Sequence, residues 1–503
     1  MSNEVRFVDQ TIRDGHQSLW AMRMSTPMML AIAPVMDEAG YEFVQLIGGG
    51  QVSAAMYNYR ENAFDRMRLL VKAMPHTPLG FGTPPKTIGG FQVMPDSVRD
   101  LWMRCCADAG AGWIGLNEFL GNYRDMSGMA ELSRKLGLKI NVPMVFAITP
   151  LHTDEWYTRK AAEIAQSLKP DNIWIKDSMG LLTPERTRTL VPAILTGIGD
   201  IPLGFHSHCN TGLAPLCYLE AVRLGARVVH TCLPPLANGT SLASAFNVER
   251  NLSLLGYQPM VNRKAMEAES AHFMYVARRE GKPIGEPVEY DVSQATRGMA
   301  GGVISNLKYY LEQRGLENRW DDVVDDIQVM CKEWGYPPNV TPYSQIMNVQ
   351  AVLNVSVGER YKVAPDETIR YLLGHFGRPP APIDQNVLDK VSSLPQAKLF
   401  LKWEQPQPSV EDLRKQIGRP GISDEELLLR ICYPQQHVEA MYAAGPIVNN
   451  YPRGDKPLLA LITELTTRKD ASHVRVEKTG FSLTLRKFRA KQGFPELYRG
   501  RAG

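Results

Sequence analysis

The chain has 503 residues, of which 44% are hydrophobic and 22% are charged, a balance typical of soluble globular proteins. One hydrophobic core rarely extends over this length, so we expect one large domain and at least one smaller domain. The formal net charge of +3 is nearly neutral, and the chain contains no long run of Lys or Arg. Nucleic acid and anionic membranes are therefore not expected as partners.

The sequence also argues against membrane insertion and secretion. No apolar run approaches the roughly 20 residues of a transmembrane helix, and the N-terminus lacks the charged and then apolar order of a signal peptide. The seven cysteines are an odd number and contain no CxxC pair, which fits a reducing compartment better than a disulfide framework. We therefore expect a cytoplasmic protein.

The first three hundred residues alternate short apolar runs with amphipathic segments. Helical patterns such as 27–40 and 95–110 end in Gly after an apolar-periodic stretch. Eight apolar runs that end in polar or Gly-rich residues predict strands at 5–10, 41–48, 77–82, 112–118, 138–147, 171–177, 201–208 and 227–233. Eight strands with intervening helices predict an α/β fold, a (β/α)8 TIM barrel, whose chemistry gathers at the C-terminal ends of the strands.

Beyond the barrel the pattern changes twice. Over 305–447 the strand signal fades and helical segments dominate. A short unit follows at 456–487, in which a helix over 457–471 precedes two alternating strands around a Lys-Thr-Gly turn. We therefore predict a metal-binding barrel over 1–304, then a mainly helical domain, and last a small α+β element that serves docking or assembly.

Ionisable side chains stand at the ends of three predicted strands. Asp9 ends the first strand, Lys176 lies at the end of the sixth, and His206 and His208 end the seventh. The ends of barrel strands converge, and residues i and i+2 of a strand share a face, so both imidazoles can point inward. Two His nitrogens and one carboxylate suit Zn²⁺, Mn²⁺, Co²⁺ or a similar ion, with a position left for substrate.

From the residues alone, alternatives stay open. The histidines can instead be core or loop residues with ordinary hydrogen bonds, although an H-x-H after an apolar strand favours a metal site. Lys176 can be a desolvated amine, a salt-bridge partner or, if carbamylated, an anionic metal ligand.

Longer motifs point to one family. In chain order they read DQTIRDGHQSLWAMRM, WIKDSMGLLTPE, FHSHCNTG, GGVISNLKYYLEQRGL, YPPNVTPYSQIMNVQAVLNV, GERYK and GRPPAPID. Over roughly residues 4–445 the chain resembles the carboxyltransferase family of biotin-dependent enzymes. That family includes the carboxyltransferase domain of pyruvate carboxylase, the α subunit of oxaloacetate decarboxylase and the pyruvate-handling subunit of transcarboxylase. The resemblance implies a barrel followed by a helical, funnel-like domain.

The resemblance also implies roles for particular residues. The divalent ion would lie on Asp9, carbamylated Lys176, His206 and His208. The catalytic groups that orient this site or face the substrate would be Arg13, Asp14 and Gln17, together with Lys176.

The sequence departs from the family where the family binds substrate. An Arg-Gly-Gln segment that helps to recognise pyruvate or oxaloacetate aligns with Pro84 at the arginine and Lys86 at the glutamine. Gly115 replaces another arginine, and Glu118 replaces an aspartate. A proline ring offers no donor where a guanidinium would grip a carboxylate, so Lys86 and Glu118 are left as candidate substrate-binding residues.

Two further departures concern proton transfer. The segment NGTSLASAF aligns with the family's GGTSQPxT, which places Ala245 at a substrate-side threonine that carries a proton between biotin and pyruvate. His230 stands where the family usually has Asp, and a histidine titrates near neutrality, so it is a candidate catalytic acid or base.

Together these observations predict a metal-dependent carboxyltransferase subunit of a multisubunit biotin-dependent carboxylase, which carboxylates or decarboxylates a non-pyruvate small molecule through an enolate-type intermediate. Two alternatives are a biotin-independent metal-dependent lyase, decarboxylase or hydrolase on the same barrel, and a non-catalytic scaffold subunit of a carboxylase complex.

The predicted partners follow from the same resemblance. We find neither an ATP-grasp biotin carboxylase region nor a biotinyl-lysine motif, so a biotin carboxylase subunit and a biotin carboxyl carrier protein would act in trans. The unit at 456–487 is similar to a short segment of such carriers and is either a docking element or a terminal appendage. A homo-oligomer is also expected.

Overall fold

The computed structural model describes most of the chain. The described residues are 3–88, 92–290, 307, 311–312, 315–419, 421–456, 458, 462, 465, 473–478 and 481–486.

Eight parallel strands form a closed barrel, as predicted. The order runs from β2 through β8 to β1, and β1 also pairs with β2, which closes the ring. The strands are β1 Glu4–Asp9, β2 Phe43–Ile47, β3 Leu79–Thr83, β4 Trp113–Leu116, β5 Lys139–Val145, β6 Asn172–Asp177, β7 Leu203–Ser207 and β8 Val228–Thr231. A short ninth strand, β9 Gln258–Pro259, pairs with the start of β1.

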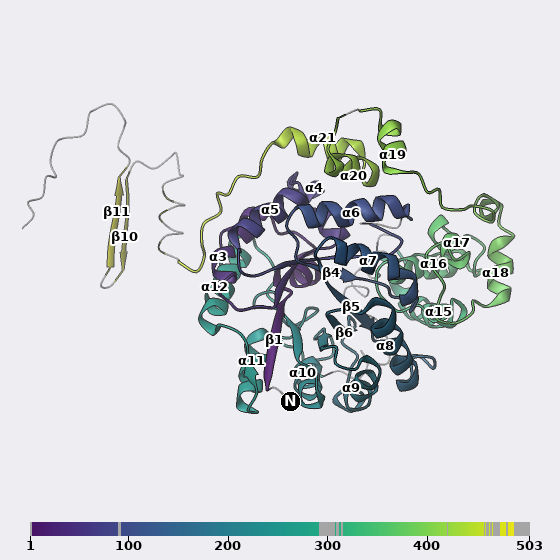
Figure 1. The fold of residues 1–503 in the computed structure, drawn as a ribbon, viewed down its shortest axis with the longest axis horizontal. Coiled ribbons are helices and arrows are strands. Elements are labelled where there is room, and N and C mark those ends of the chain that lie inside the picture. The colour runs from purple at the N-terminus through teal and green to yellow at the C-terminus, as the bar shows by residue number, and fades with distance from the viewer. Residues whose placement is uncertain are drawn as a thin grey trace, which may run out of the picture.

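The barrel strands are buried on both sides, which explains their continuous apolar runs. Every residue of β2, β3, β4 and β7 is buried, because side chains fill the inside of the barrel and helices cover its outside. Figure 1 shows this arrangement around β1. The helices of this part are α1 His16–Trp20, α2 Thr26–Leu30, α3 Ala33–Met36, α4 Gly49–Tyr59, α5 Ala63–Ala73, α6 Asp96–Asp108, α7 Ser127–Lys135, α8 Asp154–Leu168, α9 Pro184–Ile198, α10 Ala214–Leu224, α11 Ala245–Leu254 and α12 Arg263–Arg279.

One predicted helix is broken in two. The sequence pattern over 27–40 indicates a single helix, but the structure has α2 and then α3, with a turn at Ala31 and Ile32 between them. Pro34 explains the break, because its ring has no N–H and would clash with the carbonyl of Leu30 in a continuous helix.

A helical region follows the barrel, as predicted. Its helices are α15 Trp320–Glu333, α16 Tyr343–Val357, α17 Asp366–Leu372, α18 Gln385–Ser392, α19 Val410–Ile417, α20 Asp424–Cys432 and α21 Gln435–Ala444. The core around Trp334 and Met347 includes Leu120 and Val145 of the barrel. The last three helices instead pack on α4 and α6 (Figure 1). The predicted boundary at 304/305 lies outside the described residues.

The last described residues form a hairpin. Strand β10 His473–Lys478 pairs antiparallel with β11 Phe481–Arg486, which confirms the two predicted strands. The predicted helix over 457–471 falls almost entirely outside the described residues. Figure 1 shows the hairpin set apart from the barrel and the helical region.

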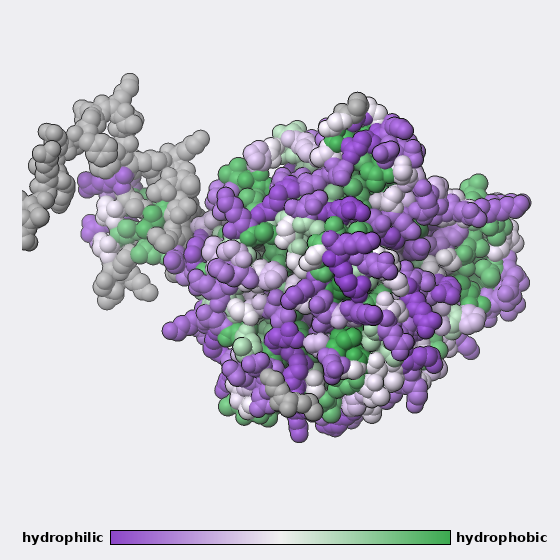
Figure 2. Space-filling model, in the orientation of Figure 1, coloured by the Kyte–Doolittle hydropathy of each residue, from purple (hydrophilic) through white to green (hydrophobic). Residues whose placement is uncertain are grey.

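The visible surface is mixed. Figure 2 shows hydrophilic side chains over much of this face, interspersed with small apolar areas. Within the described ranges, no helix is both long and apolar enough to cross a membrane.

Two glycines offer a test of how tightly the outer helices pack. A Cβ on Gly197 of α9 would lie 2.5 Å from the Thr158 carbonyl oxygen on α8, whereas a Cβ on Gly128 of α7 would meet nothing within 4 Å. Gly197→Ala should therefore lower the free energy of unfolding by about 1–3 kcal/mol. Gly128→Ala should raise it by about 0.5–1 kcal/mol, because alanine favours the helix. Thermal and urea unfolding measure both; equal effects of the two variants would contradict the close approach of α8 and α9.

Candidate functional site

A single π-helical turn follows β1 and carries two of the charged residues. In this turn, Thr11–Gly15, the Gln10 carbonyl accepts hydrogen bonds from the backbone N–H groups of residues 13, 14 and 15. Gly15 allows the turn to sit against the loop after β8, because a Cβ there would lie 2.8 Å from the Leu236 carbonyl oxygen. Such turns are frequent at functional sites. The turn brings Asp14 to the ends of β6 and β7.

Asp14, His206 and His208 form a buried cluster. Asp14 Oδ2 lies 3.6 Å from His206 Nε2, and Asp14 Oδ1 lies 3.5 Å from His208 Nε2. One ligand atom from each residue lies within 4.8 Å of the others. The Arg13 guanidinium contacts Asp14 Oδ2 at 2.6 Å. Two imidazoles and a carboxylate in this arrangement can hold a divalent transition-metal ion.

The hydrogen bonds of the histidines fit a metal site. His208 Nδ1 donates to the Thr240 carbonyl at 2.7 Å, so its Nε2 is the nitrogen that faces the cluster and can bind a metal once it is deprotonated. Neither ring nitrogen of His206 has a hydrogen-bond partner among the described residues, although the ring is fully buried. Buried polar nitrogens rarely stay without a partner, and a metal ion would provide one.

Electrostatics keep His206 and Asp14 in the forms that metals bind. Burial lowers the pKa of His206 well below its ordinary value, so this imidazole is neutral. Burial by itself would raise the pKa of Asp14, but the charge of Arg13 and the contact with His208 hold it well below its usual range. A neutral imidazole and an ionised carboxylate are the ligand forms required. For His208, burial would lower the pKa, but the charge and contact of Asp14 raise it, so a bound metal would displace a proton from this ring.

The carboxylate of the cluster corrects our expectation. We expected Asp9 as the metal ligand, but the structure brings Asp14 to the histidines and leaves Asp9 outside the cluster. Asp9 Oδ1 instead accepts hydrogen bonds from the backbone N–H and the hydroxyl of Thr11. Burial raises the pKa of Asp9 to about 7. The π turn reverses the chain after Asp9, which the sequence alone did not reveal.

Lys176 lies beside the cluster without an ion-pair partner among the described residues. Its Nζ lies 5.0 Å from the centre of the Phe119 ring and 5.6 Å from that of Trp174. Burial and the nearby charge of Arg13 lower its pKa to about 8. A fraction of Lys176 is therefore a neutral amine near neutral pH, which is the nucleophilic form.

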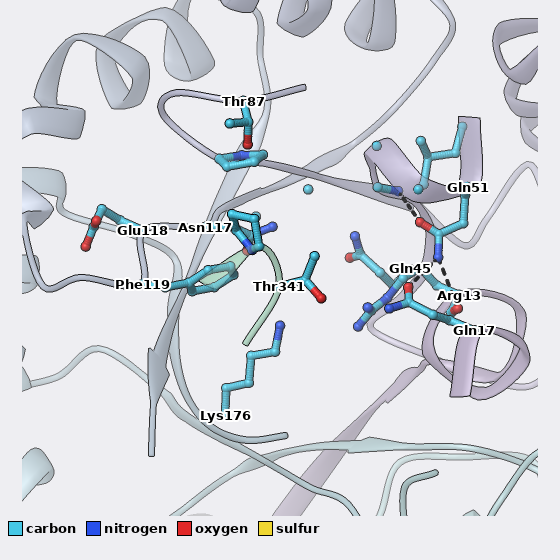
Figure 3. A pocket seen from close by; sticks show the side chains of 18 of the residues that line it. Arg13, Gln17, Gln45, Gln51, Thr87, Asn117, Glu118, Phe119, Lys176 and Thr341 are labelled. Carbon is cyan, nitrogen blue, oxygen red and sulfur yellow. Dashed lines mark hydrogen bonds between the residues drawn. The ribbon is translucent and has the colours of Figure 1, made fainter. Parts of the chain in front are cut away.

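Two adjoining cavities meet at Arg13, Gln17 and Lys176. The first, here the barrel cavity, has a volume of about 390 Å³ and reaches into the barrel between Gln45 and Asn141. The second, the rim cavity, has a volume of about 490 Å³ and contains Asp14, His208 and Thr240. Thr341 and Gln345 of the helical region line both cavities, so this region covers the mouth of the barrel. Figure 3 shows Arg13, Gln17, Gln45 and Lys176 around the barrel cavity.

The predicted substrate residues have different surroundings. Glu118 stabilises its own loop. Its two carboxylate oxygens accept hydrogen bonds from the backbone N–H groups of residues 120, 121 and 122. Figure 3 shows its carboxylate pointing away from the cavity. Lys86 is exposed and lines the barrel cavity. Ala245 is buried at the start of α11 and lines neither cavity.

Our sequence reasoning missed Thr240. This residue lines the rim cavity, and its hydroxyl donates to the Ser18 carbonyl at 3.0 Å. Its own carbonyl orients His208. Thr240 therefore provides a hydroxyl close to the metal cluster. Ala245, which we expected at the position of the family's threonine, has no hydroxyl. The retained Thr-Ser pair at 240–241 was the available signal.

His230 and Gln10 form a pair in the wall of the barrel cavity. Gln10 Nε2 and His230 Nδ1 lie 3.1 Å apart. Burial, with contributions from the charges of Arg13 and Lys176, lowers the pKa of His230 to about 3. His230 is thus a neutral imidazole, not a group that titrates near neutrality as expected. Gln10 was not among our candidate residues, and its position after β1 was the only signal.

Comparisons with known proteins identify relatives over nearly the whole chain. A family profile described as "Conserved carboxylase domain" matches residues 295–478. A pyruvate carboxylase subunit of Methanocaldococcus jannaschii is 31% identical over 481 residues, which cover 94% of this chain and 84% of the relative. The methylmalonyl-CoA carboxyltransferase 5S subunit of Propionibacterium freudenreichii subsp. shermanii is 27% identical over 442 residues and covers 86% of each chain.

Solved structures show the same fold. The carboxyl transferase domain of Rhizobium etli pyruvate carboxylase superposes with a TM-score of 0.80 at 22% identity, over 96% of this chain and 84% of that chain. The barrel and the helical region that follows it are thus shared with that domain.

Substituting each aspartate in turn separates the two candidate ligands. Asp14→Asn should reduce bound divalent metal to less than about a tenth of the wild-type content, because the carboxylate between the histidines is lost. Asp9→Asn should leave the metal content unchanged. Elemental mass spectrometry of the purified full-length protein measures both, with circular dichroism to check folding. Metal loss confined to Asp9→Asn would restore our original assignment.

Proposed function

We propose a function on the basis that this chain belongs to the carboxyltransferase family of pyruvate carboxylases and transcarboxylase 5S subunits. In this proposal the chain is the carboxyltransferase subunit of a multisubunit biotin-dependent carboxylase whose substrate is not pyruvate. The observation that carries this proposal is the buried Asp14, His206 and His208 cluster at the junction of two cavities.

The residues of the cluster fit a resident divalent ion such as Zn²⁺, Mn²⁺ or Co²⁺, held by Asp14, His206 and His208. When bound, such an ion would polarise a substrate carbonyl and stabilise the negative charge of an enolate. Arg13 keeps Asp14 ionised by direct contact at 2.6 Å. Gln17, whose amide oxygen accepts a hydrogen bond from Gln51, stands at the junction of the two cavities and faces the substrate.

Lys176 supports the proposal in a second way. A half-buried lysine with a pKa near 8 has enough neutral amine to react with CO₂ and form a carbamate. A carbamate is an anion and would add an oxygen ligand to the two histidines and Asp14. We therefore propose Lys176, once carbamylated, as the fourth protein ligand.

The substrate differs from pyruvate because the groups that grip pyruvate in the family are missing. The resemblance aligns Pro84 and Gly115 with arginines of the family, and both residues line the barrel cavity. Cationic groups around this cavity are limited, among the described lining residues, to Arg13, Lys86 and Lys176. The Arg13 guanidinium already forms an ion pair with Asp14 and hydrogen bonds to Gln10. A bidentate guanidinium grip on a 2-oxo-acid carboxylate is thus lost.

Biotin would be delivered by a carrier protein, with a biotin carboxylase as a further partner. The relatives support a divided enzyme, because the similar proteins of M. jannaschii and P. freudenreichii are named as subunits. We assign the hairpin of β10 and β11 to docking of these partners, since an isolated two-stranded hairpin is only marginally stable and gains from a packing surface.

A pair of substitutions at Lys176 tests the carbamate. Lys176→Glu keeps an anionic oxygen near the cluster and should retain measurable metal binding, whereas Lys176→Arg keeps a cation and should lose it by about tenfold or more. Carbon-13 NMR after incubation with labelled bicarbonate should show a carbamate signal in the wild type only. Metal retention by Lys176→Arg together with loss in Lys176→Glu would instead show that the lysine acts as an ammonium ion.

The function itself is tested by affinity purification of the tagged protein from its native cells. The purified material is probed with streptavidin and analysed for metal by mass spectrometry. We expect a stoichiometric biotinylated partner and about one divalent ion per chain. Metal without a biotinylated partner would favour a biotin-independent lyase or hydrolase, and a partner without metal would favour a scaffold subunit.

A further inference from the structure

Two buried N–H donors in the wall of the barrel cavity lack an acceptor. They are Asn141 Nδ2 on β5 and His230 Nε2 on β8, and neither atom has a hydrogen-bond partner among the residues that the structure describes. Their residues are 2% and 1% exposed, and both line the cavity. A buried donor without an acceptor is costly, so these two atoms point to a missing ligand atom.

The identity of Asn141 Nδ2 as a donor is fixed by its neighbour. Trp174 Nε1 can only donate, and it donates to Asn141 Oδ1 at 3.1 Å. The other end of the amide is therefore the NH₂ group. Trp174 in turn is stacked on the His230 ring, with 4.5 Å between ring centres and 27° between ring planes. One tryptophan thus contacts both donor side chains.

The tautomer of His230 is fixed by a relay that starts at Arg13. Arg13 Nε and Nη2 donate to Gln10 Oε1 at 3.1 and 2.9 Å. Since an arginine cannot accept, the opposite end of the Gln10 amide is its NH₂ group, which faces His230 Nδ1 at 3.1 Å. His230 Nδ1 must accept this hydrogen bond. In a neutral imidazole the proton then lies on Nε2, which becomes a donor.

The surroundings of the two donors favour an oxygen atom. Glu118 is the only acidic residue among the described residues that line the barrel cavity, and its carboxylate is bonded to backbone N–H groups. Gly82 and Gly115 are partners in the register of β3 and β4, and the Asn117 amide lies over both of them. The remaining cavity, about 390 Å³ in volume, has room for an acceptor and offers little repulsion to a negative charge.

We infer that Asn141 and His230 are a pair of neutral donors that binds an sp² oxygen of the substrate, from a carboxylate or a carbonyl. This inference rests on the proposed function, because it concerns the substrate of the same site. The substrate class is an acyl compound with a second oxygen function besides the carbonyl presented to the metal cluster. Gln10 acts as a positioning residue, because it sets the tautomer of His230.

The first experiment measures the tautomer. Nitrogen-15 NMR of histidine-labelled full-length protein, with His230→Phe for assignment, should show the proton of His230 on Nε2. Gln10→Glu has nearly the same shape but only accepts, so it should move the proton to Nδ1. Gln45→Glu is the control, because it adds the same charge in the same cavity without contacting His230. A wild-type proton on Nδ1 would overturn the inference.

The second experiment measures binding by calorimetry, with metal-loaded protein and two probes that differ in their second oxygen function. Acetoacetate carries a carboxylate, and methyl acetoacetate carries an uncharged ester carbonyl. At least one probe should bind the wild type about tenfold or more tightly than His230→Phe, which keeps the stacked ring but has no donor. His230→Gln, which retains a side-chain N–H donor, should recover part of the affinity.

The outcomes separate the possibilities. Binding of acetoacetate alone assigns the pair to a carboxylate, and equal binding of both probes assigns it to a carbonyl oxygen. The same affinity in wild type and His230→Phe, including no measurable binding by either protein, would overturn the inference. The proposed function is judged separately, by the biotinylated partner and the metal content, so either idea can fail while the other stands.

Discussion

The burial of one ionised carboxylate, that of Asp14, constrains the rest of the site. A buried carboxylate without partners is very unfavourable, so this side chain needs cations and donors around it. Arg13 contacts one oxygen at 2.6 Å, and the hydroxyl of Ser18 donates to the other at 2.9 Å. The two histidines complete the surroundings. A π turn supplies this geometry, because it places Arg13 and Asp14 together at the barrel mouth.

Arg13 connects the metal cluster to the cavity inside the barrel. Through one guanidinium it neutralises Asp14, and through Gln10 it determines which nitrogen of His230 carries the proton. The same charge helps to lower the pKa of Lys176 and of His230. Ligand ionisation, a reactive amine and a neutral donor therefore depend on one half-buried cation, and changes at Arg13 would disturb all three together.

In the proposed site, neutral donors take the place of charged ones in binding the ligand. An unpaired buried guanidinium would be costly in the empty site, whereas an unpaired amide or imidazole N–H costs less. Amide and imidazole donors also keep their form across the physiological pH range, since the pKa of His230 is about 3. Recognition of this kind depends on the direction of each N–H donor more than on charge. Specificity therefore depends on the residues that orient these donors, such as Gln10 and Trp174.

The sequence by itself determined the eight strands, the helical region and the H-x-H pair, because hydrophobic periodicity and the two-residue repeat of a strand are local properties. The resemblance to the family also led us to expect different residues at substrate-binding positions such as Pro84. Only the tertiary structure decided that Asp14 and not Asp9 meets the histidines, that Glu118 serves its own loop, and that His230 is neutral. The first depends on barrel closure, which brings the ends of β1 and β7 together. The second depends on the conformation of the loop after β4, and the third on the burial of the ring, and hydrophobic periodicity encodes neither.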